Sequence, residues 1–114
     1  KLCEAQMEGG SGMGIGRTLY EQMVVENGVP INPNFVDYKL SSIMEIPVMD
    51  EEAMAAIPQP HREGPFGAKG FSEGAQSPTA PAIANALYNA LGVRIKDLII
   101  SREKVLQALR GLKR

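Results

Sequence analysis

The chain has 114 residues, with 12 Lys and Arg against 13 Asp and Glu, 44% hydrophobic residues and a net charge of −1. This length suffices for one domain at most, and the scattered charges form no basic stripe for a nucleic-acid backbone. No apolar run approaches the roughly 18 residues that a membrane-spanning helix needs, so we expect neither a nucleic-acid nor a membrane partner, and a cytoplasmic location.

The supply of metal-binding side chains is small. Cys3 is the sole cysteine and His61 the sole histidine of the chain. An internal disulfide needs a second cysteine, and a closed zinc or iron–sulfur site needs about four Cys or His ligands. Any metal chemistry must therefore use a cofactor that is held largely by other residues.

Two features predict that the chain is one part of a larger protein. It starts with Lys1 rather than Met, and it contains 12 Gly and 8 Pro, which neither fill a core nor stay in helices. A chain of this size buries only somewhat over about 60% of its unfolded surface, which leaves little margin for stability alone. We therefore expect it to depend on partner chains.

A helix with a glycine face is predicted near the start. Five glycines fall within residues 9–16, and Ile15, Leu19 and Met23 then recur at helical spacing as far as residue 24. Each glycine inside a helix costs about 1 kcal/mol relative to alanine, so a second backbone or a ligand is expected to come close. A dinucleotide-binding loop is excluded because Arg17 stands where the third glycine of that motif belongs.

Turns and short strands are predicted next. The Asn-Gly pair at residues 27–28 is typical of a tight turn. Residues 35–40 read as a short extended stretch, and residues 43–48 as a strand bounded by a proline. The acidic, alanine-rich residues 50–56 fit a helix or a loop equally well.

A long glycine- and proline-rich loop follows, in which residues 64–74 read Gly-Pro-Phe-Gly-Ala-Lys-Gly-Phe-Ser-Glu-Gly. The spacing misses the phosphate-binding P-loop, because the lysine arrives one position early and no Ser or Thr follows it. Loops of such length without structure of their own are usually functional or disordered. Glu73 stands out here as a carboxylate suited to a general base, although a solvated loop acid is the simpler alternative.

Two helices are predicted in the remainder. Residues 77–81 read as a helix start, with Ser or Thr as the N-cap and a proline in the first turn, and Gly92 marks the end of this helix. Residues 98–100 predict a short buried strand, and Ser101 the cap of the last helix. The residues expected to face inward from the two helices are Ile83, Leu87, Leu91, Val105, Leu109 and Leu112.

Three separated motifs resemble the C-terminal end of the molybdenum hydroxylases, the xanthine dehydrogenase/aldehyde oxidase family. They are residues 6–16 with 32–39, the loop at 64–74, and residues 80–94 with 103–109. The motifs stand in the family's order and cover nearly the whole chain. The resemblance implies an α+β fold in which residues 1–114 are a C-terminal segment of the molybdopterin-binding domain. This incomplete segment comprises a glycine-faced helix, short strands, the catalytic loop and two C-terminal helices, and another chain completes it.

The resemblance also implies the site residues. Glu73 corresponds to the glutamate that stands beside the molybdenum without ligating it and acts as a general base, and no residue of the chain is expected to ligate the metal. The residues implied to contact the cofactor are Gln6, Gly9, Gly10, Gly70 and Ser72.

The implied activity is the oxidative hydroxylation of an N-heterocycle, such as a purine, or of an aldehyde, with water as the oxygen source. The chain would belong to a multichain oxidoreductase and be inactive alone. Molybdopterin would be held mainly by the rest of the molybdopterin-binding subunit, and iron–sulfur clusters and FAD would lie on other chains or domains. The alternative is a non-catalytic structural or assembly chain of such a complex. Glu73 favours catalysis, because packing needs no carboxylate in that loop.

Overall fold

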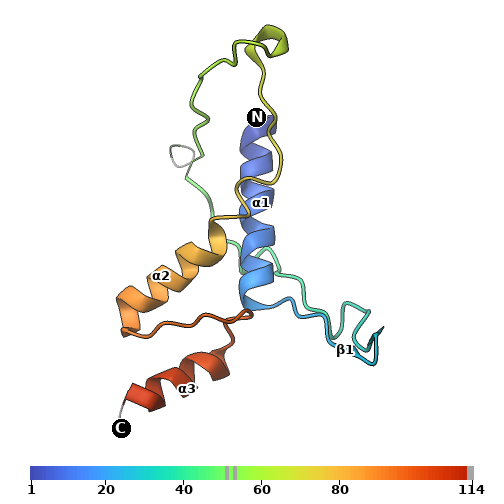
Figure 1. The fold of residues 1–114 in the computed structure, drawn as a ribbon, viewed down its shortest axis with the longest axis vertical. Coiled ribbons are helices and arrows are strands. Elements are labelled where there is room, and N and C mark those ends of the chain that lie inside the picture. Colours follow the sequence, from blue (N-terminus) through green and yellow to red (C-terminus); the bar gives the residue numbers. More distant parts are fainter. Residues whose placement is uncertain (51, 53, 113–114) are drawn as a thin grey trace.

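The computed structural model describes residues 1–50, 52 and 54–112, and its helices and strands are spread along an elongated chain (Figure 1). The principal extents are 57 × 37 × 28 Å and the Cα radius of gyration is 17.8 Å, against about 13 Å for a compact domain of this length. In chain order the elements are α1 (Leu2–Leu19), β1 (Val25–Glu26), β2 (Val29–Pro30), the 3-10 helix η1 (Pro65–Gly67), α2 (Thr79–Leu91) and α3 (Arg102–Leu112). The described residues therefore have the predicted α+β composition.

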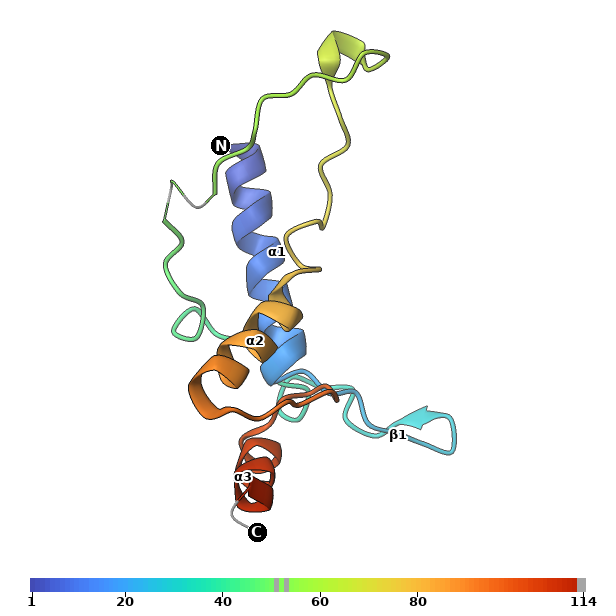
Figure 2. The ribbon, with the colours of Figure 1, turned by 60° about the vertical axis from the view of Figure 1, so that its left-hand side comes forward.

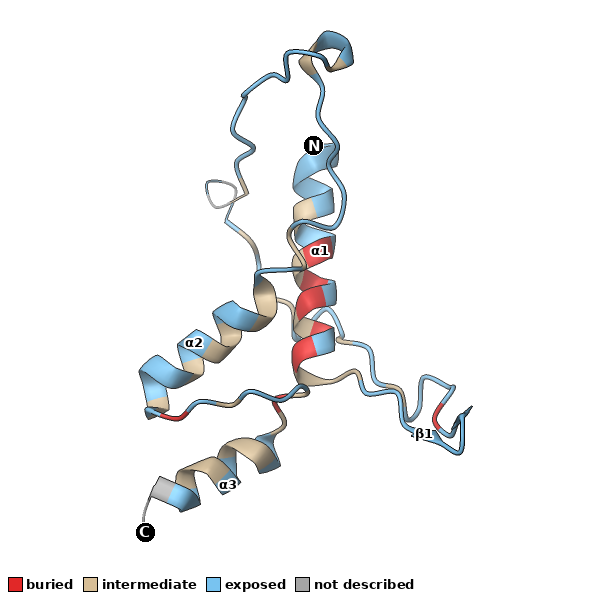
Figure 3. Cartoon of the chain, viewed as in Figure 1, coloured by how far each residue is buried: buried red, intermediate tan, exposed pale blue. Residues whose placement is uncertain are grey.

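Helix α1 is the central element, and the chain packs on it from two sides. Gly10, Gly12, Gly14 and Gly16 are buried. Figure 3 shows that the buried residues of α1 lie in the C-terminal half of the helix. A Cβ added at Gly14 would lie 2.5 Å from the Cβ of Thr79, and one added at Gly12 would lie 3.0 Å from the Cδ1 of Ile46. The predicted approach of a second backbone is confirmed at Gly10, where an added Cβ would lie 3.4 Å from the backbone N of Gln76.

The end of α1 differs from the prediction, because the helix stops at Leu19 and residues 20–24 lie outside it. The N–H groups of Tyr20 and Glu21 both donate to the carbonyl of Gly16, at 2.8 and 2.9 Å. The second of these bonds spans five residues, so the regular spacing of four residues is lost there. The carbonyl of Thr18 instead accepts the N–H of Ile100 at 2.8 Å, which joins the last turn of α1 to the segment before α3.

The Asn-Gly turn is confirmed and closes the β1–β2 hairpin. Asn27 and Gly28 have φ values of 50° and 81°, the left-handed pair that a two-residue hairpin turn requires. The strands are antiparallel, with Val25 opposite Pro30 and Glu26 opposite Val29. In Figure 2 the hairpin projects away from the three helices.

The strands predicted at residues 43–48 and 98–100 are wrong, and so is the extended stretch predicted at residues 35–40. All three segments form turns, bends and irregular backbone. Side-chain acceptors bind the backbone N–H groups locally: Asn34 Oδ1 accepts from Val36 at 3.0 Å, and Glu45 Oε2 accepts from Ser42 at 2.6 Å. Such local bonds compete with strand pairing. The bonds from Ser42 also hold the pKa of Glu45 below its usual range. Within residues 50–56, positions 51 and 53 lie outside the described residues, and the others are turn or irregular.

Helices α2 and α3 form as predicted, with one difference at a cap. The N-cap of α2 is Pro78 rather than a Ser or Thr. Thr79 is the first residue of the helix, and its hydroxyl donates to the carbonyl of Ala75 at 3.0 Å. Gly92 ends α2 with φ 72°, as expected. Ser101 caps α3, where its Oγ accepts the N–H of Lys104 at 3.2 Å.

Little apolar surface is buried. Ile83, Leu87, Leu91, Val105 and Leu109 are half-buried, and the side chain of Leu112 lies outside the described residues. Among the described hydrophobic residues the core proper is Val93 and Ile100, each 5% exposed, whereas Phe66, Val48 and Leu2 are 89% exposed or more. Apolar surface of this extent is typical of a protein–protein contact. None of the described helices is long and apolar enough to cross a membrane.

Asn32 closes the base of the hairpin and provides a test of this fold. The side chain is 8% exposed; its Oδ1 accepts the N–H of Val24 at 2.8 Å and its Nδ2 donates to the carbonyl of Gln22 at 2.6 Å. Asn32→Ala leaves two backbone groups without partners, which we expect to cost about 1–3 kcal/mol of local opening free energy. Hydrogen exchange of the Val24 and Ile31 amides measures this cost.

The matched control for this change is Asn89→Ala, at an exposed position of α2. Alanine has the higher helix propensity, so this variant should leave the exchange of the hairpin amides unchanged. Equal exchange rates in the two variants would contradict the role assigned to Asn32.

Candidate functional site

The predicted site residues come from two motifs that are far apart in the sequence and meet in the structure. Gln6, in the first half of α1, donates from its Nε2 to the carbonyl of Ser72 at 3.2 Å, across a sequence separation of 66 residues. Ser72 immediately precedes Glu73. The hydrogen bond therefore joins the helix motif to the loop that carries the predicted base.

Glu73 lies where the loop turns into α2. Its carbonyl accepts the N–H of Gln76 at 3.0 Å, which forms a turn just before the first residue of α2. The side chain is exposed, and its carboxylate makes no hydrogen bond or ion pair with another described residue. The carboxylate is thus accessible to a group that approaches from outside this chain.

The three glycines predicted to contact a cofactor are of two kinds. A Cβ added at Gly9 or Gly70 would have no atom within 4 Å, whereas one at Gly10 would lie 3.2 Å from the Cβ of Ala75. Gly9 and Gly70 therefore leave their backbone accessible from outside, while the missing side chain of Gly10 is explained by packing within the chain. Their roles toward a cofactor stay predictions.

An open groove of about 640 Å³ lies between α1 and the long loop, and its volume falls within the range of about 300–1,000 Å³ seen for small-molecule sites. Gly70 is the predicted residue that lines it, and Lys69 supplies the one charged side chain of the lining. Met7, next to Gln6, and Phe71, next to Ser72, also line it. Sequence reasoning missed both, because an apolar side chain beside a motif carries no signal of its own.

The residues of this region fit a bulky organic cofactor. Gly70 has space where a side chain would stand, Gln6 contributes an amide, and Lys69 a cation. Gly9 is equally open but lines a separate pocket with Ile43 and Val48. Among the described residues no three His, Cys, Asp or Glu side chains gather into a group that could hold a metal ion.

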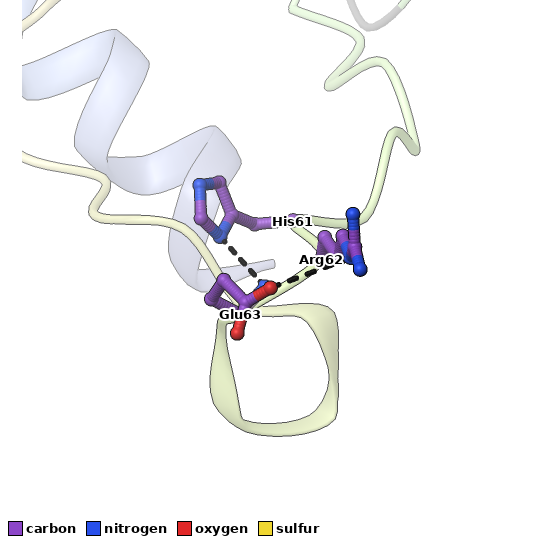
Figure 4. A network of polar contacts seen from close by, with 3 residues as sticks. All are labelled: His61, Arg62 and Glu63. Atoms are coloured by element: carbon purple, nitrogen blue, oxygen red, sulfur yellow. Dashed lines mark hydrogen bonds and ion pairs between the residues drawn. The ribbon is translucent and has the colours of Figure 1, made fainter.

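The outer part of the loop holds itself together. The N–H of His61 donates to the carbonyl of Gly67 at 2.9 Å, and the N–H of Gly67 donates to the carbonyl of Gly64 at 2.8 Å. Figure 4 shows the side-chain contacts: His61 Nδ1 accepts the N–H of Glu63 at 3.1 Å, and Arg62 Nε lies 3.4 Å from Glu63 Oε1. These side chains are exposed, and their contacts stay within the loop.

A second pocket, of about 510 Å³, lies beside the last turns of α1 and contains none of the predicted site residues. Within it Tyr38 Oη donates to Glu21 Oε2 at 2.7 Å. This hydrogen bond to a carboxylate, with some desolvation, raises the pKa of Tyr38. No sequence pattern connects these two residues.

Comparison with known proteins gives consistent matches. The profile of the molybdopterin cofactor-binding domain matches residues 1–47. The xanthine dehydrogenase molybdenum-binding subunit of Escherichia coli O157:H7 is 38% identical over 91% of this chain and 14% of its own length. The aldehyde oxidoreductase molybdenum-binding subunit of Escherichia coli K12 is 32% identical over 96% of this chain and 15% of its own length.

A solved structure agrees with these matches. The crystal structure of quinoline 2-oxidoreductase from Pseudomonas putida 86 superposes with a TM-score of 0.78 and 25% identity, over 94% of this chain and 14% of that chain. The chain thus spans about one seventh of the length of the relatives it matches.

The Gln6–Ser72 hydrogen bond can be tested by removing its donor. Gln6→Leu keeps the size of the side chain, and losing a net contribution of about 0.5–1.5 kcal/mol should speed amide exchange in residues 72–76 by about two- to tenfold. Mass spectrometry of deuterium uptake measures the change. Gln107→Leu, at an exposed position of α3, is the matched control; the bond is refuted if both variants exchange at the wild-type rate.

Proposed function

This chain belongs to the xanthine dehydrogenase/aldehyde oxidase family of molybdenum-binding subunits, and from that premise we propose that it completes the active site of a molybdenum hydroxylase. The observation that carries the proposal is the hydrogen bond from Gln6 to Ser72, because it brings both implied cofactor motifs together beside Glu73. Residues 1–114 then form one segment of the molybdopterin-binding domain, which the rest of the subunit completes.

The proposed reaction is the oxidative hydroxylation of an electron-poor carbon, with water as the oxygen source. The relatives are named for xanthine, quinoline and aldehyde, so the substrate class is a nitrogen heterocycle, such as a purine, or an aldehyde. When bound, the molybdenum cofactor supplies the two-electron oxidation. Iron–sulfur clusters and FAD held by other chains or domains would supply the electron acceptors.

Glu73 is proposed to be the general base. As the water oxygen bonds to the substrate carbon, a carboxylate oxygen of Glu73 takes up the proton that is released. Its exposure and its lack of a partner among the described residues support this role, since a carboxylate held in an ion pair within the chain would be a weaker base.

The other implied residues are proposed to hold the cofactor. One N–H of the Gln6 amide is used on Ser72, which leaves its second N–H and its carbonyl oxygen for the cofactor. Gly9 and Gly70 let the cofactor approach the backbone, because neither carries a side chain and neither has an atom of the chain within 4 Å of the Cβ position. Ser72 orients Gln6 through its carbonyl.

The proposed partners are the rest of the molybdopterin-binding subunit, an iron–sulfur subunit and an FAD subunit. Supporting this, large apolar side chains such as Val48 and Phe66 are almost fully exposed, and the relatives are about seven times longer than the chain. A cytoplasmic location belongs to the proposal, because the free thiol of Cys3 suits a reducing compartment.

A non-catalytic assembly role is the second candidate, and the packing of Gly10 against Ala75 is the observation that favours it. Glu73→Gln separates the two candidates. In the complete enzyme isolated from its source, this substitution should lower kcat by about 10²–10⁴-fold, because the amide cannot accept the proton. The molybdenum content should stay unchanged.

Glu63→Gln is the matched control, since Glu63 is an exposed acid of the same loop whose contacts are local. Its turnover should equal that of the wild type. Wild-type turnover in Glu73→Gln at unchanged molybdenum content would overturn the general-base proposal and favour the assembly role.

Native mass spectrometry with metal analysis should find this segment together with the other chains and about one molybdenum per copy, as a cofactor-completing role requires.

A further inference from the structure

We propose that one face of α1 acts as a positioning surface for Glu73. This inference rests on the proposed role of Glu73 as the base. It concerns how the carboxylate is held in place rather than what it does. The residues that carry it are Gln6, Gly10 and Gly14 on the helix, and the segment from Ser72 to Thr79 that runs along them.

The three helix residues are spaced four apart, so they lie one above another on a single face of α1. Each meets a different point of the facing segment. The amide of Gln6 bonds to the carbonyl of Ser72 at 3.2 Å. The open sides of Gly10 and Gly14 face Ala75 and Thr79, with a built Cβ at 3.2 and 2.5 Å from the respective Cβ atoms.

Glu73 is therefore placed between two fixed points. Ser72 is held on one side by Gln6, and Ala75 rests against Gly10 on the other. The turn between them is closed by the bond from the N–H of Gln76 to the carbonyl of Glu73, at 3.0 Å. In Figure 2 the tip of the long loop extends beyond the N-terminal end of α1, so the described contacts on both sides of Glu73 come from α1.

The contact between Gly14 and Thr79 fixes the position of the first residue of α2 against α1. Thr79 fills the space left by the missing side chain of Gly14, and its hydroxyl donates to the carbonyl of Ala75 at 3.0 Å. A methyl group at position 14 would meet the Cβ, Oγ1 and Cγ2 atoms of Thr79, all within 3.0 Å. Because these atoms lie next to the backbone, the whole segment must move rather than one flexible side-chain end.

Gly14→Ala tests the inference in the complete enzyme. A displacement of the base by about 1 Å can cost up to about 10² in rate, so kcat should fall at least tenfold while KM changes less than about twofold. Deuterium uptake in residues 72–79 should rise in the same protein, which is a readout independent of turnover.

Gly12→Ala is the matched control. It makes the same substitution on the same helix, but its methyl group would face the Cδ1 end of Ile46, which can rotate away, and not the segment that carries Glu73. Both the uptake of residues 72–79 and kcat should match the wild type. Adding Thr79→Gly to Gly14→Ala removes the three colliding atoms but also the hydroxyl that bonds to Ala75, so it should restore part of the lost kcat.

The outcomes separate this inference from the proposed function. If Glu73→Gln turns over like the wild type, the general base is wrong and the positioning role falls with it. If Glu73→Gln is inactive but Gly14→Ala matches Gly12→Ala in kcat and in uptake, the positioning inference alone is overturned. Should Gly14→Ala fail to assemble, Gly10→Ala replaces it, because an added Cβ there would lie 3.2 Å from the Cβ of Ala75 rather than 2.5 Å from that of Thr79. Ala75→Gly then serves as the compensating substitution.

Discussion

The close approach of the chain to the glycines of α1 is the contact on which the rest of this structure depends. Each glycine weakens the helix by about 1 kcal/mol relative to alanine, and the compensation is packing at distances that a side chain would prevent. Gly14 admits Thr79 and Gly12 admits Ile46 from another direction. Helix α1 thereby joins the middle of the chain to the start of α2, although the described part of the chain buries little apolar surface elsewhere.

The small buried core and the exposed candidate site are consequences of the same arrangement. The buried residues of α1 are Gly10, Gly12, Gly14, Gly16 and Thr18, whereas the first turns of the helix, most of the long loop and the side chain of Glu73 are exposed. In the proposed function, this surface would form one wall of an active centre rather than an enclosed pocket. Such a wall suits a cofactor of which a larger subunit holds the remainder, and the match to relatives about seven times longer agrees with that division.

Local sequence signals predicted the features that depend on neighbouring residues: the Asn27–Gly28 turn, the Gly92 stop and the Ser101 cap. The strands failed because pairing needs a second strand, and side-chain acceptors such as Asn34 took up the N–H groups instead. The meeting of Gln6 with Ser72 spans 66 residues, so only the family resemblance suggested it. Sequence could not separate the packing role of Gly10 from contact with a cofactor, because both need the same missing side chain.

Hydrogen bonds within the tip of the long loop, residues 61–67, order its backbone before it meets another surface. Its backbone bonds from His61 to Gly67 and from Gly67 to Gly64 fix the turn without help from the rest of the chain, while Phe66 stands fully exposed upon it. A flexible loop would lose conformational entropy on meeting a neighbouring surface, at about 0.5–1.5 kcal/mol for each immobilised side chain and more for its backbone. Here most of the backbone ordering precedes contact, so the tip can enter a complementary surface as a rigid body, and the free energy of burying the Phe66 ring goes largely into association.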